Sequence, residues 1–148
     1  MGQVAPLPSG RVYVDACTLI YSVERIEPFC TTVAPMWDAL RNGRIAIITS
    51  AISLLEVLVK PIRDDNTALV DQYKSVLTQA TGLSCVPLTM PLMEEAARLR
   101  AFLNLKTPDA IHAASALESE CVLFVTNDTV FKRVPGLNVV VLSEVVAA

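Results

Sequence analysis

Residues 106–117, with the sequence KTPDAIHAASAL, decide the fold that we predict for this chain. Pro108 suits the first position of a helix because it has no amide hydrogen to leave unpaired, and Thr107 is a residue type that caps helices. The positive end of the helix dipole favours a carboxylate at Asp109, and small apolar residues follow on nearly every face. We therefore predict a helix over residues 107–119 that is buried in a sheet protein. Taken alone, Asp109 is explained by the dipole, so a functional role needs other acids nearby.

Short apolar segments alternate with helical ones on both sides of this stretch. Each predicted strand is apolar at consecutive positions, which is typical of a strand covered on both faces in a parallel sheet. We expect strands over residues 11–14, 45–49, 83–86, 122–126 and 137–142. We expect helices over residues 18–23, 33–41, 51–59, 63–80, 91–103 and 107–119, and a short last helix capped by Ser143. The pattern predicts a three-layer α/β domain over residues 11–146, with a mainly parallel five-stranded sheet flanked by helices, after a flexible lead-in of residues 1–10.

Four acidic residues fall at one edge of the predicted sheet. Asp15 and Asp128 directly follow strands, and Glu56 and Asp109 lie on helices that begin at the same edge. In open α/β sheets, ligands bind beyond the carboxyl ends of the strands, near the point where the strand order reverses. The sequence therefore predicts an acidic site at this edge.

Glu56 lies on a predicted helix that Ser50 caps and that ends before Pro61. Lys60 follows Glu56 by four positions, so an exposed ion pair between the two is one explanation of this acid. The helix is otherwise so apolar that we expect it to be largely buried, where a carboxylate is costly unless a positive partner meets it.

Four carboxylates in one place repel one another, and at least one of them holds a proton unless a cation joins them. Oxygen ligands without a cysteine pair or a second histidine suit Mg²⁺ or Mn²⁺ and argue against zinc. An ion held by few carboxylates keeps bound waters, one of which becomes a nucleophile while the metal neutralises charge on a phosphate. The pattern indicates metal-assisted attack of water on a phosphate.

The composition of the chain, 148 residues and 16.0 kDa, predicts one domain with an apolar interface. Hydrophobic residues make up 53% of the chain and its mean hydropathy is +0.49, which is more than one small core easily hides, so we expect a homodimer, a protein partner or both. The net charge of −3 gives no general attraction for nucleic acid, so if the substrate is a nucleic acid, local patches or a dimer groove must supply the positive charge.

The sequence also predicts where the chain works. No segment has the roughly 18 consecutive apolar residues of a membrane helix, and the N-terminus lacks the apolar core of a signal peptide, so we expect a cytoplasmic protein with no membrane contact. The cysteines are widely scattered without a CxxC pair, and we interpret them as small buried side chains: Cys17, Cys30, Cys85 and Cys121. Neither a zinc site nor a disulfide framework is predicted.

Four segments carry the acids in a fixed order: residues 14–16 (VDA), 50–57 (SAISLLEV), 106–114 (KTPDAIHAA) and 125–131 (VTNDTVF). Together they resemble the motifs of the PIN-domain family, in particular the ribonuclease toxins of the VapC type. One acid after an apolar strand is common, but four in this order form a specific signal. The resemblance covers the chain from about Arg11 to Leu142.

The resemblance implies a ribonuclease, dependent on Mg²⁺ or Mn²⁺, that cleaves RNA phosphodiester bonds by attack of activated water. It also implies a homodimer and an antitoxin partner, whose helical segment lies in an apolar groove and obstructs the acidic site. Thr126 matches the polar residue that orients the acidic group. The acids that serve the family as metal ligands or base match Asp15, Glu56, Asp109 and Asp128 here. We expect Asp15, Asp109 and Asp128 to lie closest to the ion.

Basic residues and a histidine accompany these acids. Lys106, Lys132 and Arg133 flank the predicted site and are candidates for holding RNA phosphates, or they are ordinary solvated charges. Lys132 and Arg133 also follow the last motif where some members of the family carry a further acid, which leaves a second metal site unsupported. We interpret His112, three positions after Asp109, as a packed core histidine rather than a base because its neighbours are alanine and isoleucine.

Three other functions are weaker interpretations of the same fold class. A phosphohydrolase with an aspartyl nucleophile has a second acid two positions after the first, where this chain has Cys17. A receiver-type signalling module requires an aspartate after a middle strand, but here residues 49–50 and 87–88 follow the second and third strands. A PIN-like protein that binds partners without catalysis ranks below the nuclease because all four acids are present. The sequence leaves open which RNA is cut and whether one or two ions act.

Overall fold

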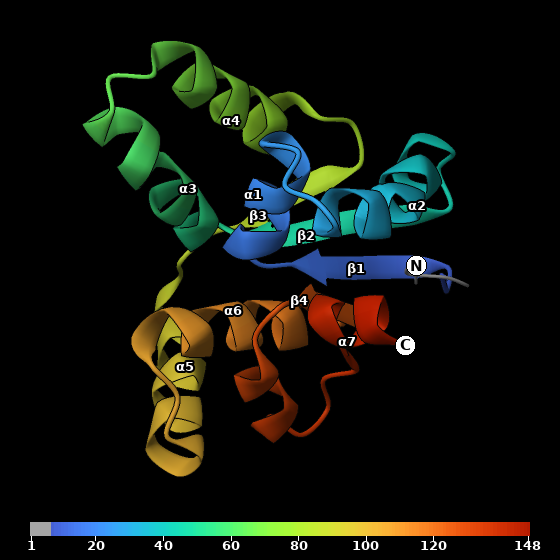
Figure 1. The fold of residues 1–148 in the computed structure, drawn as a ribbon. Coiled ribbons are helices and arrows are strands. Elements are labelled where there is room, and N and C mark those ends of the chain that lie inside the picture. The colour runs from blue at the N-terminus through green and yellow to red at the C-terminus, as the bar shows by residue number, and fades with distance from the viewer. Residues whose placement is uncertain (1–6) are drawn as a thin grey trace.

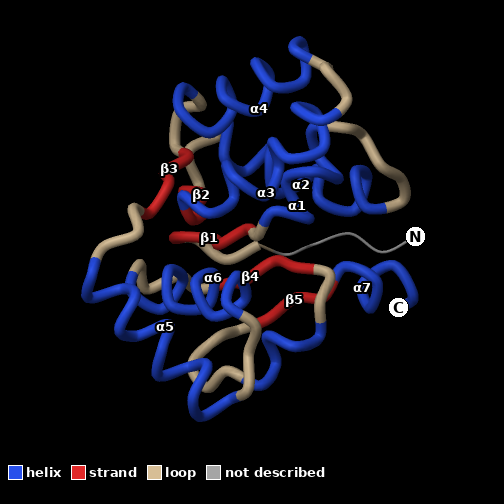
Figure 2. The backbone as a smooth tube through the Cα atoms, turned by 90° about the vertical axis from the view of Figure 1, so that its left-hand side faces the viewer, coloured by secondary structure: helices blue, strands red, loops and turns tan. Residues whose placement is uncertain are grey.

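The computed structural model describes residues 7–148, which form a five-stranded parallel sheet between two layers of helices (Figure 1 and Figure 2). The strands are β1 (Gly10–Val14), β2 (Ile45–Ser50), β3 (Leu83–Val86), β4 (Leu123–Thr126) and β5 (Val139–Val141). The helices are α1 (Ala16–Val23), α2 (Phe29–Arg41), α3 (Ala51–Arg63), α4 (Thr67–Gln79), α5 (Met90–Leu103), α6 (Thr107–Glu118) and α7 (Leu142–Ala147), with a 3₁₀ helix η1 (Thr129–Arg133). This architecture confirms the predicted three-layer α/β fold.

The strand order is β3-β2-β1-β4-β5. From β1 the chain first adds β2 and β3 on one side and then β4 and β5 on the other. The order reverses between β1 and β4, where Val14 pairs in parallel register with Val125. The residues that follow these two strands, including Asp15 and Asp128, therefore emerge side by side. This is the position at which open α/β sheets bind ligands.

Both faces of the sheet are buried, as the consecutive apolar residues of its strands predict. Val12 and Val14 point into the core under α1, α2, α3 and α4, whereas Tyr13 between them points into the core under α5 and α6. On this second face the ring of Tyr13 stacks on Phe124 at a centroid distance of 4.8 Å, and Phe124 contacts Phe131 at 4.5 Å. The alternation of one strand therefore stabilises two separate cores, and it sends the hydroxyl of Tyr13 toward α6.

Two helices differ from prediction around proline and asparagine. We predicted that the helix after Ser50 ends before Pro61, but α3 continues to Arg63 with Pro61 buried in its last turn, where only one intrahelical bond is lost. We predicted one helix over residues 63–80, but α4 begins at Thr67 because Asn66 caps it by accepting from Leu69 N.

Other predicted ends were also wrong. The helices predicted to start at residues 18 and 33 begin at 16 and 29. Thr107 does not cap α6, because its hydroxyl accepts a hydrogen bond from Arg100, and the capping position belongs to Lys106 without a side-chain bond. Ser143 does not cap α7, because its amide and hydroxyl both donate to Asn127. The last strand covers residues 139–141 rather than 137–142.

The predicted lead-in of residues 1–10 falls mostly outside the described residues, which begin at Leu7, and β1 already starts at Gly10. In residues 7–148 the structure contains no helix that is both long and apolar enough to cross a membrane.

Candidate active site

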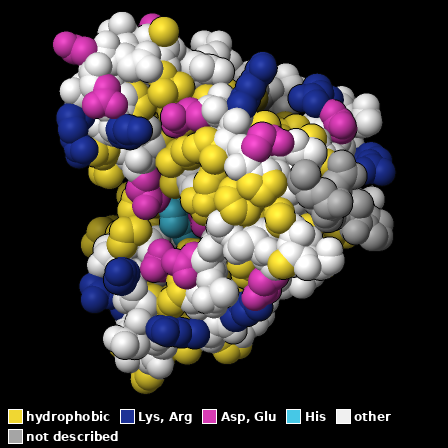
Figure 3. All heavy atoms as spheres, viewed as in Figure 1, with side chains coloured by type: hydrophobic (Ala, Val, Ile, Leu, Met, Phe, Trp, Pro, Cys, Tyr) yellow, Lys and Arg dark blue, Asp and Glu magenta, His cyan; other side chains and the backbone are white. Residues whose placement is uncertain are grey.

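Four acidic side chains approach one another at the carboxyl edge of the sheet. Asp15 follows β1 and caps α1, and Asp128 follows β4 and caps η1. Asp109 lies in the first turn of α6, and Glu56 lies on α3, which contacts α6. Figure 3 shows acidic side chains around a hollow in which the only histidine of the chain is visible.

Asp15 is the most firmly held of the four acids. It is 6% exposed, and one of its oxygens accepts from Thr18 N at 3.2 Å, Thr18 Oγ1 at 3.1 Å and Cys17 Sγ at 3.0 Å. Burial and the charge of Asp15 raise the pKa of the Cys17 thiol, so that thiol remains a donor. The other oxygen of Asp15 accepts from Thr126 Oγ1.

Thr126 joins the two acids that follow strands. Its hydroxyl is fully buried, donates to Asp15 Oδ2 at 2.5 Å and accepts from the backbone N of Asp128 at 3.1 Å. The carboxylate of Asp128 in turn accepts from Val130 N at 2.9 Å. One threonine therefore fixes the separation of the chain segments after β1 and β4.

Glu56 has a partner that the sequence did not reveal. Its Oε1 lies 2.6 Å from His112 Nε2, and His112 Nδ1 lies 2.6 Å from the hydroxyl of Tyr13. The alternative explanation of Glu56, an exposed ion pair with Lys60, is not formed in the described structure. His112 is 3% exposed, as expected for a packed core histidine, but its contact with Glu56 places it at the edge of the acidic group. Its spacing of three positions after Asp109 was the only signal for this contact.

The prediction that α3 is largely buried was wrong. Leu55, Val59 and Ile62 are 64%, 47% and 59% exposed, and they form an apolar face that no other described element covers. The α3 surface holds a groove of ≈ 560 Å³ along this face. Glu56 is therefore not a charge enclosed by its own helix, but an acid at the border between an open apolar face and the acidic hollow.

The electrostatics of Asp109 show how close the acids are. Burial raises the pKa of this half-buried carboxyl, and the charges of Asp128, Glu56 and Asp15 raise it further, while His112 acts in the opposite direction. Asp128, Glu56 and Asp15 therefore all lie within the range over which their charges act on Asp109. Their common role as a metal site stays a prediction.

The donor chemistry of this site fits a hard divalent ion. Apart from His112, whose two ring nitrogens are both hydrogen-bonded, every candidate ligand is an oxygen. Within residues 7–148, no three acidic, cysteine or histidine side chains are already arranged at ligand distances. Electrostatic interactions between carboxylates act over longer distances than metal–ligand bonds. The acids therefore surround the hollow without meeting at one point. The fit to such an ion therefore rests on the chemistry of the oxygen donors and not on their spacing.

The three basic candidates lie on the surface with different partners. Lys132 pairs with Glu144 at 2.7 Å, and Arg133 donates to the carbonyl of Asn104 at 3.4 Å. Lys106 is exposed and precedes the helix of Asp109, and in the part of the chain that the structure describes it forms no ion pair.

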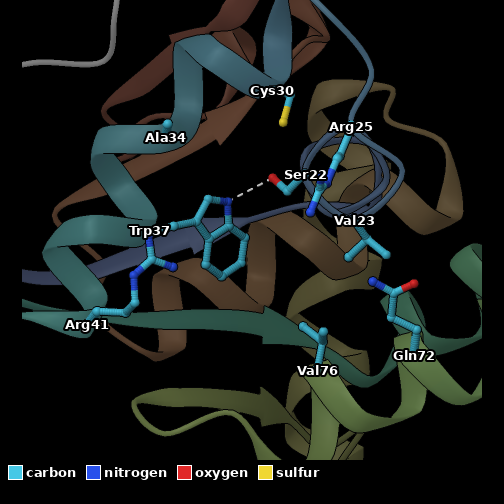
Figure 4. Close-up of a pocket in the computed structure, with 9 residues that line it drawn as sticks. All are labelled: Ser22, Val23, Arg25, Cys30, Ala34, Trp37, Arg41, Gln72 and Val76. Atoms are coloured by element: carbon cyan, nitrogen blue, oxygen red, sulfur yellow. Dashed lines mark hydrogen bonds between the residues drawn. The ribbon is translucent and has the colours of Figure 1, made fainter.

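A separate pocket of ≈ 430 Å³ lies between α1, α2 and α4 (Figure 4). Trp37 donates from Nε1 to Ser22 Oγ at 2.8 Å there, and Arg25 and Arg41 lie at its border. None of the four acids lines this pocket, so it is distinct from the acidic hollow.

Comparison with known proteins gives one family and several similar folds. The family model described as PIN domain matches residues 12–137, a range that contains all four acids. No curated protein gives a significant match to the chain.

Several solved structures share the fold. VapBC2 of Rickettsia felis, bound to a DNA fragment from its promoter, has 17% identity and a TM-score of 0.65 over 88% of this chain and 97% of that chain. A toxin–antitoxin complex from Klebsiella pneumoniae has 22% identity and a TM-score of 0.64 over 87% and 95% of the two chains. VapC20 of Mycobacterium tuberculosis, described as a toxin that cleaves the sarcin–ricin loop, has 15% identity and a TM-score of 0.68 over 82% and 92%.

Proposed function

The chain belongs to the PIN-domain family, and from this premise we propose that it is a metal-dependent endoribonuclease, the toxin of a toxin–antitoxin pair. The observation that carries the proposal is the group of four carboxylates where the strand order reverses. Burial and the neighbouring acids raise the pKa of Asp109, and a divalent cation would relieve that repulsion. Toxin–antitoxin complexes among the structures of the same fold support the biological role, and the cytoplasm, where RNA is accessible, is the place we propose for it.

We assign the roles by position. Asp15, Asp109 and Asp128 are the candidates to hold Mg²⁺ or Mn²⁺, and Glu56 is a further ligand or the base that accepts a proton from the attacking water. When bound, the ion would lower the pKa of a water ligand and neutralise charge on the phosphate. Thr126 restricts the rotation of Asp15 through its hydrogen bond.

Among the basic residues, Lys106 is the first candidate for an RNA phosphate contact. It is exposed next to the helix that carries Asp109. Lys132 and Arg133 stay candidates, but Lys132 must first leave Glu144. Because the chain has a net charge of −3, these few cations have to supply the local attraction for RNA.

The exposed apolar face of α3 supports a protein partner. We propose that an apolar segment of the antitoxin covers the groove along Leu55, Val59 and Ile62, because a segment lying there also reaches the neighbouring Glu56. A homodimer, which the apolar composition also favours, is the competing occupant of this face. The variant Leu55→Asp should abolish copurification with the product of an adjacent small reading frame while the chain sediments as before. If Leu55→Asp instead converts a dimer to a monomer and the antitoxin still binds, the face belongs to a second copy.

A catalytically inactive PIN-like module that only binds proteins is the second candidate function, and the same apolar face favours it. The two functions separate in an RNA cleavage assay with tRNA, rRNA and mRNA substrates and millimolar Mn²⁺. We expect cleavage by the wild type, at least 100-fold less by Asp109→Asn, and unchanged cleavage by the control Glu94→Gln, an exposed acid on α5. Unchanged cleavage by Asp109→Asn would remove this residue from the site, and a wild type without activity on every RNA would favour the binding module.

Metal binding gives a test that does not depend on finding the substrate. An ion that binds only the folded chain, and whose concentration is 100 times its Kd, stabilises the fold by about 2.7 kcal/mol. We expect Mg²⁺ or Mn²⁺ to raise the Tm of the wild type and to raise that of Asp109→Asn by less. Equal shifts in both proteins would place the ion elsewhere.

A further inference from the structure

A chain of two hydrogen bonds, the first buried and the second partly buried, runs from the interior of the sheet to the acidic hollow. It begins at the fully buried hydroxyl of Tyr13 on β1, passes through His112 on α6 and ends at Glu56 on α3. The two contacts measure 2.6 Å each and join residues that are 99 and 56 positions apart. Three different elements therefore meet in this one network.

The network assigns the protons on the imidazole. A carboxylate oxygen accepts hydrogen bonds, so Nε2 of His112 carries the hydrogen that points to Glu56. In the neutral imidazole Nδ1 is then the acceptor, and the hydroxyl of Tyr13 donates to it. A tyrosine hydroxyl carries its hydrogen at neutral pH, so it is able to donate here. Every polar atom of the imidazole is thus satisfied by one tautomer.

Packing alone does not account for this histidine. A buried polar ring costs free energy unless its nitrogens are hydrogen-bonded, and an apolar residue would fill the space between alanines at no such cost. What His112 provides is a fixed donor for a flexible acid. The long side chain of Glu56 has many rotamers, and in the described residues the ring of His112 is its only hydrogen-bond partner.

We propose that Tyr13 and His112 are positioning residues, which hold the carboxylate of Glu56 in one orientation at the acidic hollow. Tyr13 fixes the tautomer and the plane of the imidazole, and the imidazole in turn fixes Glu56. The inference rests on the proposed function, because it gives Glu56 an orientation-dependent part in metal binding or water activation.

The first test is spectroscopic and needs no activity. The chain has one histidine, so ¹⁵N-labelled histidine gives a single pair of ring signals. We expect the wild type to show the Nε2–H tautomer, and Glu56→Gln and Tyr13→Phe each to shift these signals. Tyr73→Phe is the matched control, because Tyr73 is also buried and its hydroxyl also donates a hydrogen bond, in this case to the carboxylate of Glu24 in the other core. Ring signals that do not change in Glu56→Gln would overturn the inference.

The second test is kinetic. We expect Tyr13→Phe, which keeps the ring packing, and His112→Leu to lower kcat for RNA cleavage by about tenfold to hundredfold with little change in KM, because a misplaced catalytic group costs rate more than binding. The control Tyr73→Phe should keep the wild-type kcat. His112→Gln, which retains an N–H donor, should recover part of the loss, and Tyr13→Phe should cost nothing further in a Glu56→Gln background.

The possible results separate the two hypotheses. An active wild type with an unchanged kcat in both Tyr13→Phe and His112→Leu overturns the positioning role and leaves the nuclease function standing. An additive loss in Tyr13→Phe combined with Glu56→Gln also overturns it. A wild type that cleaves no RNA contradicts the proposed function, and the histidine signals then still decide whether the network exists.

Discussion

Asp15 and Glu56 lie at the same edge of the sheet but are held in opposite ways. Asp15 accepts four hydrogen bonds, three of them from Cys17 and Thr18 within three positions along the chain. Glu56 has one partner in the described structure, His112, which is 56 positions away. Asp15, which follows a strand, is thus fixed mainly by residues next to it in the sequence, whereas Glu56, which lies on a helix, depends on a distant side chain.

The largest expected effect is the loss of stability in Asp15→Ala. This change leaves the donors of Thr18, Cys17 and Thr126 without their acceptor and removes the cap of α1, so we expect the free energy of unfolding to fall by about 3–4 kcal/mol. Glu56→Ala should cost about 1–2 kcal/mol, because only one buried N–H is left unpaired. Urea denaturation of the two variants measures the difference, and equal costs would contradict the comparison.

A smaller effect is expected for the link between the two strand ends. Thr126→Val has nearly the same shape but lacks the hydroxyl that donates to Asp15 and accepts from Asp128 N, so it should lower the free energy of unfolding by about 1–3 kcal/mol. Thr126→Ser keeps the hydroxyl and should recover most of that loss. If valine is tolerated as well as serine in urea denaturation, Asp15 is held by its local donors alone.

The smallest expected effect is a gain in stability rather than a loss, and it concerns Asp109. Burial and the three neighbouring acids raise its folded-state pKa above the ordinary 3.8, so the folded state binds more protons than the unfolded one between these two values. This acid therefore destabilises the fold above its raised pKa, and the penalty disappears as the pH falls to the unfolded value. We expect Asp109→Asn, without metal, to raise Tm at pH 7 by about 1–4 °C.

The pH dependence provides the control for this variant. The difference in Tm between Asp109→Asn and the wild type should shrink as the pH is lowered toward 3.8, and differential scanning calorimetry across this range measures it. Because other groups titrate in both proteins, only the difference is informative. A lower Tm in Asp109→Asn at pH 7 would mean that its carboxylate is stabilised rather than strained.

The sequence was sufficient to predict the sheet and the positions of the acids on it. Runs of consecutive apolar residues such as 45–48 indicate strands buried on both faces, and Asp15 and Asp128 follow their strands directly. The sequence was not sufficient for the helix ends. Pro61 was predicted to end a helix, but it is buried in the last turn of α3. Thr107 was predicted to cap a helix, but its hydroxyl accepts a hydrogen bond from Arg100 instead.

The composition predicted an apolar interface, but the sequence did not place it on α3. A helix that carries Leu55, Val59 and Ile62 beside one acid predicts burial, because apolar side chains usually leave water within their own domain. In the structure these residues stay exposed, which fits a partner that the sequence of one chain does not contain.

By itself, the order of residues determined that this chain forms a parallel α/β sheet with acids after its strands, because strand burial and chain reversal follow from patterns only a few residues long. The tertiary structure decided which groups surround each acid. It brought Tyr13 and His112 to Glu56 from two other elements, since contacts across 56 and 99 positions depend on how layers pack and not on spacing along the chain.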